Sequence, residues 1–201
     1  VEELAAILTD FKSQLEAEDT PLRGKRPLSR QMVLPAGLWA STKRWPLAVY
    51  KPGRGGTPAA WEPSHTRFAA GEHPQTIAMN QDSGKPVQVA TVIGHILQGL
   101  LLGRPVDLRR LVDCAEPGTL PDEVEWSQME DACIKSDIDV MKVENVALKE
   151  LLQVVVGPGA EVTPAWYAKA RWWLNLKRAS VPVSFQDGSE TPTPKRLCPP
   201  V

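Results

Sequence analysis

Cysteine and histidine are scarce in this chain, with three residues of each type among 201. The cysteines are Cys114, Cys133 and Cys198, an odd number at spacings that fit neither a zinc motif nor a disulfide framework. No histidine has a cysteine or a carboxylate partner at metal-ligand spacing. We therefore expect reduced thiols in an intracellular, reducing compartment, and neither a bound metal nor a cofactor.

Patterns typical of catalysis and of membrane insertion are also missing. The chain has no Gly-x-x-x-x-Gly-Lys-Ser/Thr loop, which excludes a P-loop ATPase. Ser64 and His65 are adjacent, but no further residues complete a catalytic triad pattern around them. The most apolar stretch, residues 93–102, contains glycine and polar residues and is too short to cross a bilayer. The sequence predicts that the protein is not an enzyme and that it has no membrane partner.

Acidic residues are absent between positions 20 and 61, although the chain as a whole has a formal net charge of −1. Acids dominate residues 113–150 and are absent again from residues 162–186. A nucleic-acid backbone responds to such local patches and not to the summed charge. The basic segment of residues 20–61 carries eight cations, which are Arg23, Lys25, Arg26, Arg30, Lys43, Arg44, Lys51 and Arg54.

The same segment is too rich in proline and glycine to form long regular elements, and the whole chain has nineteen prolines, about twice the usual frequency. We expect residues 20–61 to form an extended basic arm, with at most one short strand at residues 47–50. Trp39 and Trp45 lie near Lys43 and Arg44, an interleaving used to grip single strands by stacking and ion pairing. Equally, these tryptophans could fill grooves on the protein's own helices while the charges are only solvated.

Helical signals begin after the arm. Apolar residues at helical spacing predict a first helix that Gly71 closes, a short second helix at residues 76–81, and a turn at residues 82–84. A longer, largely apolar third helix is predicted from Lys85 to Leu102, with Pro86 in its first turn and Gly103 as its stop. His95 falls within this helix, where a packed or capping histidine is a better interpretation than a ligand.

The remaining segments complete an all-α prediction. Asp107 is expected to cap a short helix, and two apolar patterns predict helices near residues 126–133 and 148–155. Thr163 and Pro164 are expected to open a final helix. The predicted organisation is an amphipathic helix at residues 1–19, the basic arm at 20–61, a multi-helix domain containing a helix-turn-helix at 62–178, and a proline-rich tail at 179–201.

The block Thr91-Val-Ile-Gly-His-Ile, preceded by Lys85-Pro and followed by Gly103-Arg-Pro-Val-Asp-Leu, resembles the helix-turn-helix domain found toward the C-terminus of RecQ and Werner-type helicases. The likeness extends to Val162-Thr-Pro-Ala-Trp-Tyr-Ala-Lys-Ala-Arg-Trp-Trp-Leu, which is similar to the closing helix of that domain. It covers residues 59–176 without the helicase motor. The resemblance implies an accessory domain that binds nucleic acid or docks on protein, and it implies no catalytic residue.

Two functions are consistent with these patterns. The first is a non-catalytic structural and nucleic-acid-binding component of a large ribonucleoprotein assembly, such as an organelle ribosome, with RNA and neighbouring proteins as partners. The alternative is a DNA-binding accessory domain of a RecQ/Werner-like helicase or exonuclease. Because the third helix offers few of the polar residues that read a DNA groove, RNA is favoured over DNA. The candidate nucleic-acid-binding residues are the eight cations of the arm with Trp45, Lys85 and Gln88, and Lys169, Arg171, Lys177 and Arg178 of the final helix.

The first residue is Val1, and the sequence therefore has no initiating methionine. This beginning is compatible with a cleaved organelle-targeting peptide, such as that of a mitochondrial protein, and equally with a partial chain. We therefore keep a mitochondrial or other organellar location as an expectation, and the identity of the first residue does not support it over a partial chain.

Overall fold

A computed structural model describes residues 30–42, 44–82 and 84–187 of the chain. These residues form a mostly helical fold with two small two-stranded sheets. The predicted multi-helix body is confirmed, and the all-α class is wrong in omitting the two small sheets. The predicted helix at residues 1–19 lies outside the described residues, as does the tail beyond residue 187.

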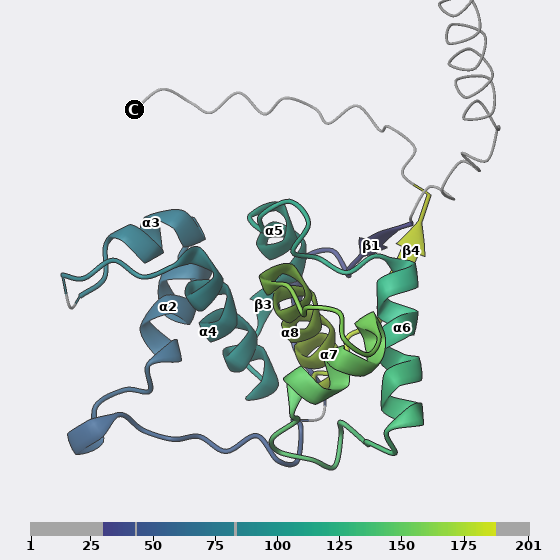
Figure 1. Ribbon diagram of the computed structural model, residues 1–201. Coiled ribbons are helices and arrows are strands. Elements are labelled where there is room, and N and C mark those ends of the chain that lie inside the picture. Colours follow the sequence, from purple (N-terminus) through teal and green to yellow (C-terminus); the bar gives the residue numbers. More distant parts are fainter. Residues whose placement is uncertain (1–29, 43, 83, 188–201) are drawn as a thin grey trace, which may run out of the picture.

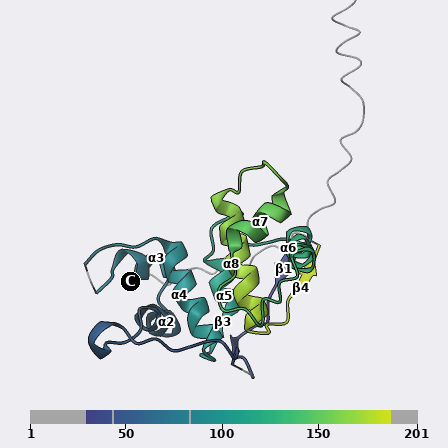
Figure 2. The same cartoon turned by 60° about the horizontal axis from the view of Figure 1, so that its bottom comes forward.

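Helices α4 (Val89–Leu101) and α8 (Pro164–Arg178) pack against each other at the centre of the structure. Figure 1 shows α2, α3 and α4 on one side of α8, with α6 and α7 on the other. The same order is kept when the view is turned in Figure 2. Helix α8 is thus shared by two groups of helices.

The first group begins with α2 (Trp61–Ala69) and α3 (Pro74–Met79), both packed on α4. Gly71 follows α2 with a φ of +105°, which glycine adopts without strain, so it closes the helix as predicted. The His73 side chain caps α3 by accepting a hydrogen bond from the Gln75 N–H. The predicted two short helices before a longer one are confirmed.

The predicted start of the third helix is wrong. Helix α4 begins at Val89 and not at Lys85, with Gln88 extended at φ −73° and ψ 146° as its N-cap. The Val87 N–H donates to the Ala78 carbonyl at 2.9 Å, which ties this segment to α3 and holds it out of helical geometry. Pro86 consequently precedes the helix.

The end of α4 agrees with the prediction and has a Schellman geometry. Gly103 adopts a φ of +80°, its N–H donates to Leu100 O at 3.0 Å, and the Arg104 N–H donates to Gly99 O at 3.0 Å. The chain then enters β3 (Val106–Asp107) and α5 (Leu108–Asp113). The Asp107 carboxylate accepts from the Arg110 N–H at 3.0 Å and caps α5 as expected.

The second group consists of α6 (Glu123–Lys135) and α7 (Leu148–Val156), which pack on each other, with α7 also on α8. A capping box starts α6, because Asp122 accepts from the Glu125 N–H while the Glu125 carboxylate accepts from the Asp122 N–H. Gly157, with a φ of +94°, ends α7. Helix α8 begins at Pro164 after an extended Thr163, as predicted, although the Thr163 side chain makes no capping hydrogen bond.

The described part of the arm is extended and lies on the helical body. Strand β1 (Gln31–Val33) pairs antiparallel with β4 (Ser184–Gln186), and β2 (Leu38–Trp39) pairs antiparallel with β3. A short 3₁₀ helix, η1 (Arg54–Gly56), precedes α2. The strand predicted at residues 47–50 is wrong, because the Ala48 N–H turns back to the Trp45 carbonyl at 2.9 Å.

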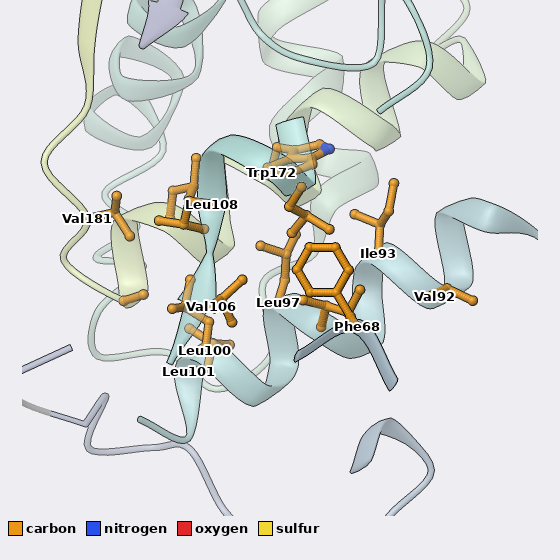
Figure 3. Close-up of a cluster of buried hydrophobic side chains, with 14 of the residues drawn as sticks. Phe68, Val92, Ile93, Leu97, Leu100, Leu101, Val106, Leu108, Trp172 and Val181 are labelled. Carbon is orange, nitrogen blue, oxygen red and sulfur yellow. The ribbon is translucent and has the colours of Figure 1, made fainter. Parts of the chain in front are cut away.

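Two apolar clusters form the core, and α8 contributes to both. Trp172 and Leu176 belong to the first cluster with α2, α3, α4 and α5, and Figure 3 shows Trp172, Phe68 and Leu97 among its side chains. Trp173 lies in the second cluster with α6 and α7. Consecutive residues of a helix point about 100° apart, so adjacent tryptophans reach different clusters. From the arm, Leu34, Trp45 and Ala48 add to the first cluster.

Substitution by alanine is expected to have opposite effects on stability at the two glycines inside α4. A Cβ on Gly99 would lie 2.7 Å from His65 Cδ2, whereas a Cβ on Gly94 would meet nothing within 4 Å. We expect Gly99→Ala to lower the free energy of unfolding by roughly 1–3 kcal/mol through overpacking. Gly94→Ala should raise it by roughly 0.5–1 kcal/mol, because alanine is the better helix former. Urea unfolding of both variants checks this, and equal effects would contradict the close packing of α2 on α4.

Candidate nucleic-acid interface

The predicted site residues that the structure describes lie on the arm, just before α4 and on α8. Arg30, Arg44, Lys51 and Arg54 lie on the described part of the arm, and all four are exposed. Figure 1 shows this chain running from β1 past the helical body to η1 and α2. Arg23, Lys25, Arg26 and Lys43 lie outside the described residues.

Two of the arm cations form ion pairs with the body. Arg30 Nε lies 2.9 Å from Asp187 Oδ1, and its Nη1 lies 3.5 Å from Glu123 Oε1. Lys51 Nζ lies 3.5 Å from Glu144 Oε1. These side chains are at least 40% exposed, so each pair contributes little to stability in water. The pairs guide the path of the arm but leave its cations in contact with solvent.

Trp45 and Arg178 are buried and contact each other. Trp45 is 5% exposed, its Nε1 donates to Met141 O at 2.9 Å, and the Arg178 guanidinium lies 4.0 Å from the centre of its ring. Arg178 is 7% exposed and donates through Nε to Val140 O at 3.1 Å and through Nη2 to the carbonyls of Val143 and Glu144. Burial lowers the pKa of Arg178 from its ordinary value, while the charge of Glu144 opposes this shift.

These contacts differ from the prediction that Trp45 and Arg178 contact a nucleic acid. The Trp45 ring is covered by the protein's own arginine, and the Arg178 donors are used by backbone carbonyls. Of the two interpretations of the arm tryptophans, packing on the protein's own helices is the one that applies to Trp45. In this fold neither side chain presents a surface to a nucleic acid.

The lysines of α8 point toward the acidic helix α6. Lys169 pairs with Glu125, and Lys177 pairs with Glu130. The Glu130 carboxylate also accepts from Trp173 Nε1 at 2.9 Å. These lysines and glutamates are mostly covered, so the two pairs neutralise part of the acidic middle of the sequence with cations from its basic end. Arg171, by contrast, is exposed on α8.

The exposed side of α4 is polar but nearly uncharged. Lys85 and Gln88 are exposed just before the helix, and Thr91 and Gln98 are exposed along it. His95 is half-buried, and its Nδ1 lies 3.1 Å from Ser64 Oγ. Burial lowers the pKa of His95, which agrees with its interpretation as a packed histidine. Ser64 is itself buried, and this pair gives no sign of an exposed nucleophile.

A hollow of about 300 Å³ lies where the arm crosses the C-terminal end of α4. Arg44 and Tyr50 come from the arm, and Arg104 follows directly after the Schellman turn. The remaining walls of the hollow are Trp61, Leu102 and Gly103. The sequence analysis did not include Arg104 among the candidate binding residues, because it lies 60 positions from Arg44. The one local signal was Gly103, the predicted helix stop, which places a cation directly after the end of a helix.

Trp61 is the most deeply buried wall of this hollow. It is 3% exposed, and its ring meets Tyr50 edge-on at 6.5 Å and His65 edge-on at 5.9 Å between centres. Among the described residues no acceptor lies within hydrogen-bond reach of Trp61 Nε1. An unpaired buried N–H costs roughly 1–3 kcal/mol. Tyr50 is more exposed, and its hydrogen bond with Glu62 raises its pKa.

Comparison of the chain with protein-family models, curated proteins and solved structures finds no match. The resemblance to the helicase accessory domain thus stays a prediction. Within residues 30–42, 44–82 and 84–187, no group of three or more metal-ligating side chains occurs. None of the helices in those ranges combines the length and apolar character that crossing a membrane requires.

We expect Arg178→Lys to destabilise the protein by roughly 2–4 kcal/mol, because an ammonium cannot reach the same carbonyls in the planar arrangement of a guanidinium. Arg171→Lys, on the exposed side of the same helix, is the matched control and should change stability by less than about 0.5 kcal/mol. Denaturant unfolding measures both. Equal stability of the two variants would contradict the structural role of Arg178.

Stability should fall as the pH drops below about 6.5, the ordinary pKa of histidine. Burial lowers the pKa of His65, as does the charge of Arg104, while a hydrogen bond to the Pro105 carbonyl opposes the shift. The unfolded chain therefore binds protons that folded His65 resists, and protonation favours unfolding in the window below that pH. His65→Gln should flatten the decline in unfolding free energy with pH. An unchanged decline in His65→Gln would reject this assignment.

Proposed function

We propose that this protein is a non-catalytic, nucleic-acid-binding structural component of a ribonucleoprotein assembly. The observation that carries the proposal is the acid-free arm, which lies on the helical body with Arg44, Lys51 and Arg54 exposed. The lysines of α8, by contrast, are paired with glutamates of α6. The arm therefore presents exposed positive charge on a segment that has no acidic residue of its own.

An extended arm of this kind suits RNA better than a groove in duplex DNA. Its cations follow an irregular backbone path, and phosphates held along such a path need no fixed helical geometry. The anchoring of the arm through buried Trp45 fixes that path before binding. Less conformational entropy is then lost when a ligand is bound.

The helical body supports docking more than base reading. We infer that α2, α3 and α4 form the helix-turn-helix and that α4 is largely used for packing, since it contacts α2, α3 and α8. Its exposed positions, Gln88, Thr91 and Gln98, include no arginine, the side chain that most often reads guanine in the major groove. This is why a DNA-reading accessory domain remains the second candidate.

The proposed assembly is an intracellular one, for which an organelle ribosome is the leading example. Burial raises the pKa values of Cys114 and Cys133, so both thiols resist forming the reactive thiolate. Both are unpaired in the structure, in keeping with a reducing compartment. Sedimentation of the native protein with ribosomal particles, abolished by ribonuclease treatment, would support this setting, and migration as a free monomer in both cases would reject it.

The role of the arm can be tested with a variant that removes two of its positive charges. We expect Lys51→Gln with Arg54→Gln to lower affinity for single-stranded RNA about tenfold at moderate salt. The slope of log affinity against log salt should fall by roughly 0.7 for each phosphate that the variant no longer neutralises. Fluorescence anisotropy with a labelled oligonucleotide measures both quantities.

The matched control is Arg109→Gln with Arg171→Gln, two exposed arginines on α5 and α8. This variant should retain most of the affinity and the salt slope. If the control loses as much affinity as the arm variant, binding is a diffuse effect of charge and the arm is not its main contact. Tighter binding of duplex DNA than of RNA would favour the accessory-domain alternative.

A further inference from the structure

We propose that a second cavity, between the arm, the C-terminal end of α4 and the loop of residues 136–147, binds one unpaired base of single-stranded RNA and prefers cytosine to uracil. The proposal rests on the proposed function and adds a sequence preference to it. Cations that contact phosphates bind every sequence alike, whereas polar groups around a cavity distinguish one base from another. No helix in a DNA groove is needed, because an unpaired base enters the protein.

The first reason is the size and the apolar character of this cavity, whose volume is about 180 Å³. That volume equals roughly six waters and is below the roughly 300–1,000 Å³ of sites for drug-sized ligands, so it suits a single flat ring. Val49 of the arm and Leu101 and Leu102 at the end of α4 contribute apolar walls. Val49 is 57% exposed, so a ring placed against it removes apolar surface from water.

The second reason is a set of polar wall groups with hydrogen-bonding capacity to spare. Gln98 and Asn145 line the cavity, and within the described residues neither side-chain amide has a hydrogen-bond partner. Each amide offers both donors and an acceptor. Glu144 also lines the cavity, and one of its carboxylate oxygens lies 3.5 Å from Lys51 Nζ. Groups of these kinds bond to the edges of unpaired bases in RNA recognition.

The expected preference for cytosine comes from Glu144. An ionised carboxylate only accepts hydrogen bonds, and acidic side chains accept from the exocyclic amino group of cytosine. Uracil carries a carbonyl oxygen at that position, which a carboxylate repels. Lys51 lies in the same wall with a 75% exposed side chain, where it meets the phosphate joined to the base. An apolar side chain of a partner protein would use none of these polar groups, so a base matches the walls better.

The third reason is that buried groups hold two of the three walls. Arg178 donates to the Glu144 carbonyl, directly before Asn145 in the chain. Buried Trp45, four positions before Val49, anchors the arm on the same loop. Walls that are fixed before binding lose less conformational entropy when a ligand enters. Arg178 and Trp45 thus support the cavity without exposing a surface to the ligand.

Side-chain amide ¹⁵N–¹H resonances of the full chain locate the base. Gln98→Leu and Asn145→Leu identify the two signals by their disappearance. Gln128→Leu identifies a matched amide that is exposed on α6 and does not line the cavity. Octacytidine should shift the Gln98 and Asn145 signals of the native protein and leave the Gln128 signal in place.

Fluorescence anisotropy with the same oligonucleotides measures the preference. The native protein should bind octacytidine about tenfold more tightly than octauridine, which is within the range for a side-chain contact to a base edge. Glu144→Gln should reduce this ratio to less than about twofold, because a glutamine amide can bond to either base. Glu150→Gln makes the same change of charge at an exposed position on α7 and should leave the ratio as it is.

Equal affinity of the native protein for both oligonucleotides, or unmoved Gln98 and Asn145 signals, overturns the cavity as a base site. If both oligonucleotides still bind in that case, the proposed function survives without it; if neither binds, the proposed function fails as well. A preference that Glu144→Gln leaves intact also overturns the proposal, because the base is then read elsewhere. N-acetyl-leucinamide is the probe for an apolar side chain of a partner. Shifts of the two signals with this compound and not with octacytidine would assign the cavity to a protein and reject the base.

Discussion

The contact between Arg178 and Trp45 joins three parts of the chain that are distant in sequence. Arg178 stands at the end of α8, Trp45 comes from the arm, and the acceptor carbonyls belong to residues 140–144 between α6 and α7. A buried guanidinium is tolerated only when its donors are satisfied, and here backbone carbonyls and an aromatic face supply the partners. The path of the arm, and with it the hollow beside α4, depends on this contact being complete.

Acidic and basic residues that form separate blocks in the sequence lie next to each other in the fold. The acidic stretch and the basic final helix are separate blocks of the sequence, yet Glu125 and Glu130 on α6 pair with Lys169 and Lys177 on α8. Mutual neutralisation of these partly covered groups ties α6 to α8. On the arm, Arg30 and Lys51 form only exposed ion pairs, so their positive charge stays in contact with solvent.

Local signals account for the elements that were predicted well. Gly71, Gly103 and Asp107 end or begin helices through backbone conformation and capping that involve only neighbouring residues. The false strand at residues 47–50 and the early start of α4 at Lys85 have the opposite origin. The turn from Trp45 to Ala48 forms where Trp45 is anchored on Met141, and the bond from Val87 to Ala78 ties the segment before α4 to α3.

The sequence by itself determined that the body is helical, where most of its helices end, and that the arm is extended and basic, because capping, periodicity and proline act within a few residues. Tertiary structure alone decided which charges stay available. Arg178 and Trp45 were removed from the predicted interface by burial, and Arg104 joined Arg44 across 60 positions. Whether a cation is buried, paired or open depends on what packs beside it, and that is a property of distant contacts.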